Sequence, residues 1–405
     1  MNIKKNHGWK LASLAMLALL AACGGSGSDD DSSENPDTLP QTSVTVIGDS
    51  LSDIGVLGVR HTVQAHADPM KTPFPLWPEL VADELKAPRP CRAYLATSET
   101  AFTPQPECRG YAVAGGRLQH PQRQTPLSIA VQLRDAAARA GAEGFGEHEV
   151  LLIDGGGNDA ADLITAYFRA YLTLVTKLDI TEYANFLSVL LGEQKTWELL
   201  LQPGGWEMAG QAYMEALGRR FAETARSQVL AHGAKRVVIL NMPDVTRTPR
   251  FLAILDILKN IGTQAADETQ GAQGQDPATY FQALFQSWIV TFNQTLGDAF
   301  QNTDEVAIVD LYAELTHWAT HGADVGLTNT TNAACPPEDP AALLPSYDIA
   351  QCTVAWLDAN APAGTAPAAG WWKTYAFADG FHPTPRGHEL MAQAVAEALA
   401  AKGWK

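Results

Sequence analysis

The chain has 405 residues, of which 46% are hydrophobic and 18% are charged, and its formal net charge is -17 at pH 7. This composition is typical of a globular chain that is long enough for one large domain or two smaller ones. The negative charge argues against a nucleic-acid partner, because phosphate backbones are bound by basic surfaces.

The N-terminus has the organisation of a targeting segment. Its first ten residues include three lysines: Lys4, Lys5 and Lys10. The apolar run that follows, Leu11–Leu20, is too short to span a bilayer as a mature helix. The run ends in "LAAC", which resembles a bacterial lipobox with Cys23 as the lipidated residue. We expect residues 1–22 to be a lipoprotein signal peptide; the alternative is an ordinary secretory signal with an incidental cysteine.

Residues 23–42 are polar and acidic, which predicts a flexible tether between a membrane anchor and a folded domain. Gly24 and Gly25, rather than Asp, follow Cys23, which resembles the sorting pattern of outer-membrane lipoproteins. The sequence therefore predicts a protein of the bacterial cell envelope that is attached to the outer membrane through its N-terminal lipid.

The remaining four cysteines form two pairs of near neighbours. Cys91 lies near Cys108, and Cys335 lies near Cys352. Four cysteines allow three pairings, and we expect the two local disulfides, because an exported chain meets an oxidising compartment. The alternative is four free thiols. No CxxC motif or Cys/His cluster indicates zinc.

Residues 43–405 have the pattern of one α/β domain. Short runs of apolar and β-branched residues predict buried strands at Ser43–Gly48, Glu149–Gly157, Lys235–Pro243 and Glu305–Tyr312. Helical patterns occur at Ser128–Ala142, Met208–His232, Pro277–Gln301 and Pro385–Lys402. This alternation predicts a mainly parallel sheet covered by helices, with ligands bound beyond the carboxyl ends of the strands.

Two stretches interrupt the alternation. Ala160–Gly205 is helical and rich in Leu, Tyr, Phe and Trp, and it is either a cap over a substrate pocket or an insertion packed on the sheet edge. Gly322–Trp372 is rich in Pro and Ala, and we expect it to be a loop region that contains one of the disulfides.

The segment "GDSLSD", Gly48–Asp53, directly follows the first predicted strand. A serine between a strand and a helix lies where unpaired N–H groups favour negative charge, which suits a nucleophile. By itself the segment is more typical of a turn. Ser50 is therefore a candidate nucleophile whose role depends on residues elsewhere, whereas Asp49 is expected to be a turn residue.

The segment "IDGGGNDAAD" follows the second predicted strand. Its glycines allow the backbone to approach a ligand closely, and the Asn158 amide can stabilise an oxyanion without being titrated. A phosphate loop is an alternative, but neither the Walker nor the dinucleotide pattern is present. A calcium loop built on Asp154, Asn158 and Asp159 lacks the EF-hand spacing.

The third polar cluster, "DGFHPT", precedes the C-terminal helix, with Thr384 as its cap and Pro385 in its first turn. A carboxylate three residues before a histidine can bind its Nδ1–H and leave Nε2 free as a base. Asp379 and His382 thus complete a nucleophile, base and orienter set with Ser50. We expect the other histidines to be ordinary surface residues: His61, His66, His120, His148, His232, His317, His321 and His388.

Four blocks in this order resemble the GDSL esterase/lipase family of the SGNH hydrolase superfamily. They are "GDSLSDIG", "GYAVAGGR" (Gly110–Arg117), "GGND" (Gly156–Asp159) and "DGFHPT" (Asp379–Thr384). The second block departs from the family pattern, because Gly110 replaces an Asn and Ala114 replaces a Gly.

The resemblance implies a flavodoxin-like three-layer α/β/α fold and a triad of Ser50, His382 and Asp379. It also implies an oxyanion hole formed by the Ser50 N–H, the Gly115 N–H and the Asn158 side chain, with Gly116 as the alternative to Gly115. It implies neither a metal nor an organic cofactor.

The expected activity is that of an exported serine esterase or lipase that cleaves carboxylic esters through an acyl-enzyme. The apolar stretch Ala160–Gly205 favours an acyl lipid or small ester as substrate, although its Trp and Tyr residues could stack on sugar rings. Two alternatives use the same site, namely a polysaccharide O-acetyl esterase and an acyltransferase. A non-catalytic surface binding protein is a further alternative.

Overall fold

A computed structural model describes residues 42–98, 100–120, 124–174, 180–265, 276–339, 345–364 and 369–405. The predicted signal peptide, the lipidation site Cys23 and the tether up to residue 41 lie outside the described residues. No helix of the described part has both the length and the apolar character needed to cross a membrane.

The centre of the domain is a parallel sheet with the strand order β1-β4-β5-β6. These strands are β1 (Ser43–Ile47), β4 (Glu149–Ile153), β5 (Arg236–Leu240) and β6 (Val306–Val309). Val46 of β1 also exchanges backbone hydrogen bonds with Arg109 and Tyr111 on its other edge. With the segment around Gly110 counted as an edge strand, the sheet has five strands. Numbered by their order in the chain, they lie in the order 2-1-3-4-5, which is the flavodoxin-like order.

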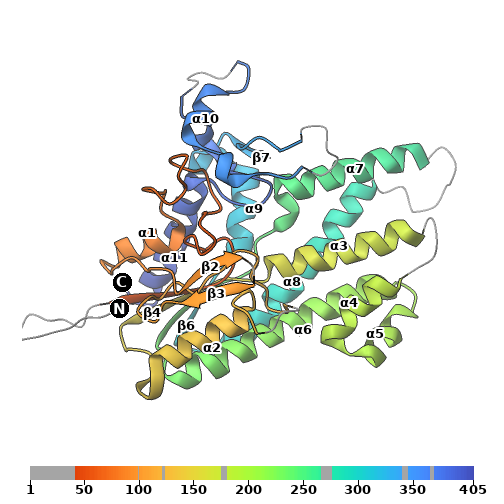
Figure 1. The fold of residues 1–405 in the computed structure, drawn as a ribbon. Helices are drawn as coiled ribbons and strands as arrows, with labels where there is room; N and C mark the ends of the chain where they lie inside the picture. Colours follow the sequence, from red (N-terminus) through yellow and green to blue (C-terminus); the bar gives the residue numbers. More distant parts are fainter. Residues whose placement is uncertain are drawn as a thin grey trace, which may run out of the picture. The chain divides into compact units, whose positions relative to one another are not determined.

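Alternate residues of each strand enter two separate cores, which explains why the strands are largely apolar on both faces. Ile47, Leu151 and Ile153 pack against α2 (Ile129–Ala140), α6 (Gly205–Gln228) and α8 (Pro277–Phe300). Val46 and Leu152 pack with α1 (Trp77–Glu84), α9 (Leu311–His321) and α11 (Pro385–Ala401) on the other face. The predicted three-layer α/β/α fold is confirmed (Figure 1).

The helical stretch predicted after "GGND" consists of α3 (Gly157–Leu174), α4 (Thr181–Leu191) and α5 (Glu193–Leu200). Tyr167 of α3 packs against Trp288 of α8, with ring centroids 5.4 Å apart, and Tyr183 and Leu187 of α4 join the same core. These helices are therefore an integral part of one layer, and Figure 1 shows them beside α6 and α8.

The structure corrects predicted boundaries and assignments, and each of the four predicted strands ends earlier than expected. The predicted strand Glu305–Tyr312 ends at Val309, because the Asp310 carboxylate accepts a hydrogen bond from Ala313 N and caps α9. The region Gly322–Trp372 is more than a loop, since it contains the strand β7 (Asn329–Ala333) and the helix α10 (Val354–Ala359). The sequence patterns also missed other elements: α1, the hairpin of β2 (Tyr94–Ser98) and β3 (Ala101–Pro104), and α7 (Pro249–Ala265).

Both predicted disulfides are present. Cys91 is joined to Cys108, and Cys335 is joined to Cys352. The second disulfide belongs to a small separate core with Val63 and Trp372, next to the short strand β8 (Tyr375–Phe377) that leads into the predicted His-containing loop.

Candidate active site

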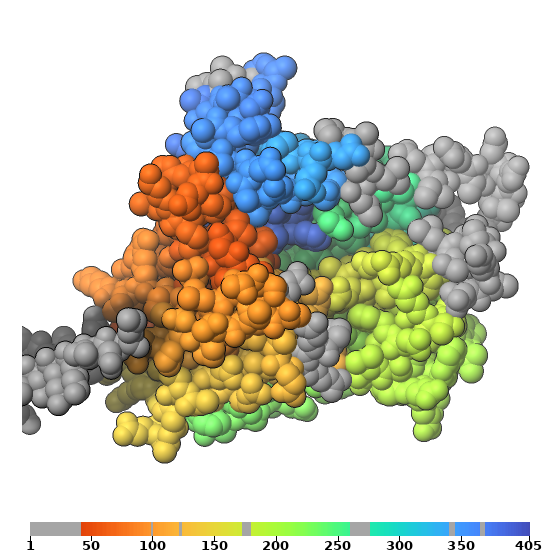
Figure 2. All heavy atoms as spheres, in the orientation of Figure 1, coloured from red at the N-terminus to blue at the C-terminus, as the bar shows by residue number. Residues whose placement is uncertain are grey.

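The polar side chains singled out in the sequence meet at the carboxyl edge of the sheet. Ser50 follows β1, Asn158 lies in the first turn of α3 after β4, and His382 lies in the loop between β8 and α11. All three line one cavity of about 410 Å³. In Figure 2 the surface is hollowed where α3, the beginning of α7 and the C-terminal blue segment meet.

A row of short hydrogen bonds joins Ser50, His382 and Asp379. The Ser50 Oγ lies 2.7 Å from His382 Nε2, and His382 Nδ1 lies 2.7 Å from an Asp379 carboxylate oxygen. The other carboxylate oxygen accepts the backbone N–H groups of Phe381 and His382, each at 2.8 Å. The carboxylate is thus held by its own loop, and it holds the imidazole in turn.

Opposing effects set the pKa values of the acid and the imidazole. Burial by itself would raise the pKa of Asp379, but the charge of His382 and hydrogen bonds from His382 and Phe381 outweigh it and lower the pKa to about 2. Burial would lower the pKa of His382, but the charge and hydrogen bond of Asp379 and the charge of Asp49 raise it above its ordinary value. Asp379 is therefore an acceptor at neutral pH, so that Nδ1 carries the proton and Nε2 can accept one from Ser50.

Two backbone N–H groups beside the serine have no hydrogen-bond partner among the described residues, those of Ser50 and Gly115. Gly115 adopts a φ of +78°, which favours glycine, and it lines the cavity. The Gly116 N–H instead donates to the Val113 carbonyl oxygen at 2.9 Å. The geometry favours Gly115 over Gly116 as an oxyanion donor. We call the surrounding segment, residues 114–119, the glycine loop.

The Asn158 amide points toward the same region. Its Nδ2 donates to the Gly116 carbonyl oxygen at 3.0 Å and has a longer contact of 3.4 Å to an Asp49 carboxylate oxygen. The first bond fixes the amide beside the glycine loop, and the second is long enough to be replaced by a stronger acceptor. An oxyanion formed at the carbon attacked by Ser50 would be such an acceptor.

Two buried carboxylates position the glycine loop. Asp53 accepts the backbone N–H of Ala114 at 2.8 Å, and Asp159 accepts those of Leu118 and Gln119 at 2.9 and 2.8 Å. Burial raises the pKa of Asp53 to about 6 and that of Asp159 to about 7. Neither residue was predicted to have this role, although both lie inside the family blocks.

Asp49 does serve the turn after β1, because its carboxylate accepts the Leu51 N–H at 3.1 Å. It also faces Asp154, to which Ser52 Oγ donates a short hydrogen bond. Burial raises the pKa of Asp49, and burial together with the charge of Asp49 raises that of Asp154 well above its ordinary value. The raised pKa values of these two carboxyl groups oppose a second full negative charge beside the serine.

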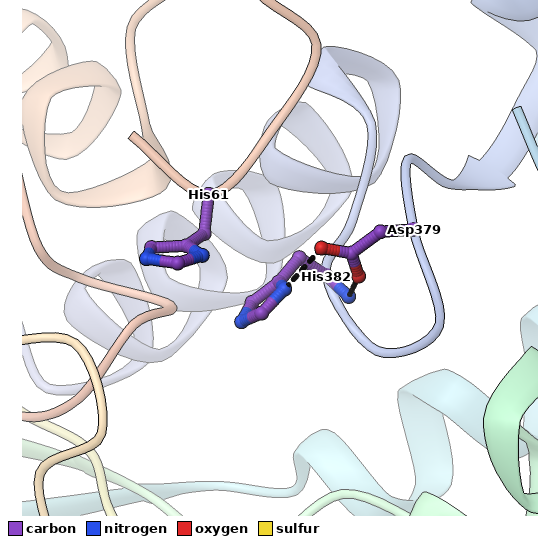
Figure 3. A group of neighbouring side chains, drawn as sticks. All are labelled: His61, Asp379 and His382. Atoms are coloured by element: carbon purple, nitrogen blue, oxygen red, sulfur yellow. Dashed lines mark hydrogen bonds and ion pairs between the residues drawn. The ribbon is translucent and has the colours of Figure 1, made fainter. Parts of the chain in front are cut away.

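His61 and His388 were expected to be ordinary surface residues, but both pack against other parts of the fold. The ring of His61 lies against that of His382, with centroids 4.5 Å apart and planes tilted by 40° (Figure 3). Burial and the charge of His382 lower the pKa of His61 to about 3, so this neighbour is neutral. His388 is fully buried in α11, and burial lowers its pKa to about 3 as well. His61 is half-buried at the cavity and His388 is buried, because long-range packing, which the local sequence does not report, brings other segments around them.

One group of side chains has the composition of a metal site. The possible ligand atoms of His61, Asp379 and His382 lie within 4.8 Å of one another. However, the Asp379 oxygens already accept three hydrogen bonds, and both nitrogens of His382 are engaged with Asp379 and Ser50. A bound ion would have to break these bonds, so the arrangement as it stands suits proton transfer better than metal binding.

The cavity beside this group is largely apolar. Its walls come from α3, α7, α9 and α11, and they include Ile164, Phe251, Ile254, Leu315, Trp318 and Met391. Such a wall excludes water, strengthens the hydrogen bonds at its edge and accepts hydrocarbon.

A flavodoxin-like sheet with Ser, Gly, Asn and Asp–His blocks at its carboxyl edge defines the SGNH class of hydrolases. A family model described as GDSL-like Lipase/Acylhydrolase matches residues 44–395. The chain therefore belongs to the GDSL-like lipase/acylhydrolase family and is a hydrolase of esterase/lipase type. No curated protein matches the sequence.

Proposed function

We propose that this protein is an exported serine ester hydrolase that cleaves carboxylic esters through an acyl-enzyme on Ser50. The observation that carries the proposal is the pair of 2.7 Å hydrogen bonds from Ser50 Oγ to His382 and from His382 to Asp379. Such a row supplies a nucleophile, a base and an orienting acid in one arrangement.

In the proposed reaction His382 Nε2 takes the proton of Ser50 as the Oγ attacks the ester carbonyl carbon. The N–H groups of Ser50 and Gly115 and the amide of Asn158 bind the oxyanion, and losing one such donor typically costs about 10²–10³ in rate. His382 then protonates the leaving alcohol. Water, deprotonated by His382, releases the acid and restores Ser50.

The apolar walls of the cavity support an acyl lipid or small ester as the substrate class. A series of p-nitrophenyl esters of increasing chain length, with acetylated xylan as comparator, tests this choice. Hydrolysis that rises with chain length supports an acyl chain, whereas preference for acetylated xylan supports O-acetyl removal instead.

The replacement Ser50→Ala tests the nucleophile. We expect the variant to lose hydrolysis of p-nitrophenyl esters and to lose labelling by a fluorophosphonate probe, with an unchanged thermal transition. Asp298→Ala, at an exposed position of α8, is the matched surface control. Full activity of Ser50→Ala in a clean preparation would overturn the mechanism.

We further propose that the mature chain is held at the outer membrane of the bacterial cell envelope by a lipid on Cys23. Both disulfides support an oxidising compartment. Metabolic labelling with radioactive palmitate should mark the wild-type chain in membranes. The variant Cys23→Ala should be unlabelled and released from the membrane fraction.

A further inference from the structure

Arg250, in the first turn of α7, carries an uncompensated positive charge on the cavity wall. Two arginines line the cavity, and the other one, Arg117, forms an ion pair with Asp162 at 2.6 Å. Arg250 has no carboxylate partner within the described part of the chain. A guanidinium on the wall of an apolar cavity is a group that a bound ligand can satisfy.

The surrounding loop fixes the position of Arg250. Its backbone N–H donates to the Gly380 carbonyl oxygen at 3.0 Å, and a Cβ added to Gly380 would lie only 3.1 Å from the Arg250 Cβ. The guanidinium carbon lies 5.4 Å from the centre of the Phe381 ring. Arg250 is thus packed on the loop that contains Asp379 and His382, so its charge has a set position relative to the proposed reaction centre.

The carboxylates of the cavity are not available to neutralise this charge. Asp162 is paired with Arg117, and Asp49 and Asp154 face each other beside the serine turn. The side chains that follow Arg250 along the wall, Phe251 and Ile254, are apolar. The cavity therefore combines a hydrocarbon surface with one unpaired cation.

We propose that Arg250 forms a subsite for an anionic oxygen group, specifically a phosphate, on the alcohol part of the substrate. The natural substrate is then an ester whose acyl chain lies along the apolar wall while its phosphate binds the guanidinium. The substrate assignment rests on the proposed ester hydrolysis, whereas binding of the phosphate does not.

The binding experiment uses hexyl phosphate, which has no carboxylic ester to cleave, with 1-hexanol as its neutral twin. Calorimetry would compare the purified wild type with Arg250→Gln, Arg250→Lys and Lys259→Gln. Lys259 is an exposed residue of the same helix outside the cavity wall, so its replacement removes one charge without touching the subsite.

Hydrogen bonds to a charged group correspond to about 10-fold to 100-fold in affinity. We expect Arg250→Gln to weaken hexyl phosphate by this amount and to leave 1-hexanol unchanged. Arg250→Lys should retain part of the affinity, and Lys259→Gln should match the wild type. Equal binding of hexyl phosphate by the wild type and Arg250→Gln would overturn the subsite, provided that thermal melting shows both proteins to be folded.

A kinetic experiment separates this inference from the proposed function. Monooctanoyl glycerol and octanoyl glycerol 3-phosphate contain the same scissile ester and differ by one phosphate. We expect Arg250→Gln to lower kcat/KM about 10-fold or more for the phosphate ester only. If the wild type cleaves neither ester, the proposed hydrolysis fails while hexyl phosphate binding still decides the subsite. If Arg250→Gln lowers both rates equally, the subsite is wrong and the hydrolase remains.

Discussion

Asp53 and Asp159 bind the glycine loop at its two ends, although they lie in different family blocks. Asp53 accepts the N–H of Ala114, and Asp159 accepts those of Leu118 and Gln119. The proposed oxyanion donor Gly115 lies between these attachment points. The position of that N–H group therefore depends on two buried carboxylates that never contact a substrate.

Replacement of Asp159 by Asn should lower activity without removing any proposed catalytic group. The amide keeps one acceptor oxygen, but its NH2 group faces a backbone donor and leaves it unpaired. We expect kcat to fall about 10-fold, with a smaller change in KM, because the donor is needed mainly in the transition state. Asp298→Asn, on the surface of α8, should leave kcat unchanged. Unaltered kcat in Asp159→Asn would mean that the loop is held by other contacts.

The rate of hydrolysis should fall on the acidic side at a pH above the ordinary pKa of histidine. His382 must be neutral to accept the Ser50 proton, and Asp379 raises its pKa above 6.5. Activity is therefore lost as the pH falls through the His382 pKa. Replacement of Asp379 by Asn should move the acidic limb of kcat/KM to lower pH, because the stabilising charge is removed, and should also reduce the maximal rate. A limb that stays in place would show that another group titrates.

The stability of the fold should also depend on Asp159. Its pKa is raised from 3.8 to about 7 by burial, so the folded state binds this proton more tightly than the unfolded state. The stabilising contribution is fully present below pH 3.8 and is lost as the pH rises through about 7. As the pH rises from 3.8 to about 7, the thermal midpoint of the wild type should fall more than that of Asp159→Asn, which has no carboxyl group to titrate at this position. Parallel curves for the two proteins would contradict the burial effect.

The two disulfides should contribute similarly to stability but differently to activity. Both close loops with a sequence separation of 17, so each should contribute about 2–4 kcal/mol to the unfolding free energy. Of the four disulfide cysteines, only Cys335 has a backbone hydrogen bond to the residue before Asp379. Its N–H donates to the Ala378 carbonyl oxygen at 2.7 Å. The double replacement of Cys335 and Cys352 by Ala should therefore lower kcat more than that of Cys91 and Cys108. Chemical denaturation and ester hydrolysis of both variants test the comparison.

Zinc should inhibit the enzyme reversibly. The imidazoles of His61 and His382 are close enough to chelate one ion, which would occupy the base and break its bond to Ser50. We expect micromolar Zn²⁺ to inhibit, EDTA to restore the rate, and EDTA alone to have no effect. His61→Phe keeps a ring beside His382 but removes the second ligand, so its rate should be less sensitive to Zn²⁺. Equal sensitivity of the variant would place inhibition elsewhere.

The strands of the central sheet and each part of the proposed triad could be predicted because the individual signals are local. The strands of the central sheet are mostly apolar because both faces of the sheet are covered, and Asp379 stands three residues before His382 in one loop. The two disulfides were also predictable, because each joins cysteines that are near in sequence. Ser50 and Asn158 followed from their positions directly after parallel strands.

The residues that sequence reasoning missed act over long distances. His61 contacts His382 through tertiary packing, and no spacing in the sequence connects them. Asp53 and Asp159 are separated in sequence from the N–H groups they accept by 61 and about 40 residues. The helix α7 was missed although Thr248 and Pro249 precede it in the same way as Thr384 and Pro385 precede α11.

Ser50 and His382 meet at 2.7 Å although 332 residues separate them along the chain. A nascent or truncated polypeptide that stops before Asp379 has the proposed nucleophile but neither the proposed base nor its orienting acid. The proposed hydrolytic capacity therefore arises only after the loop with Asp379 and His382 has been made and has folded beside Ser50. In the exported lipoprotein that we propose, this arrangement is a form of latency: a partly made chain cannot attack the lipids of the cell that produces it.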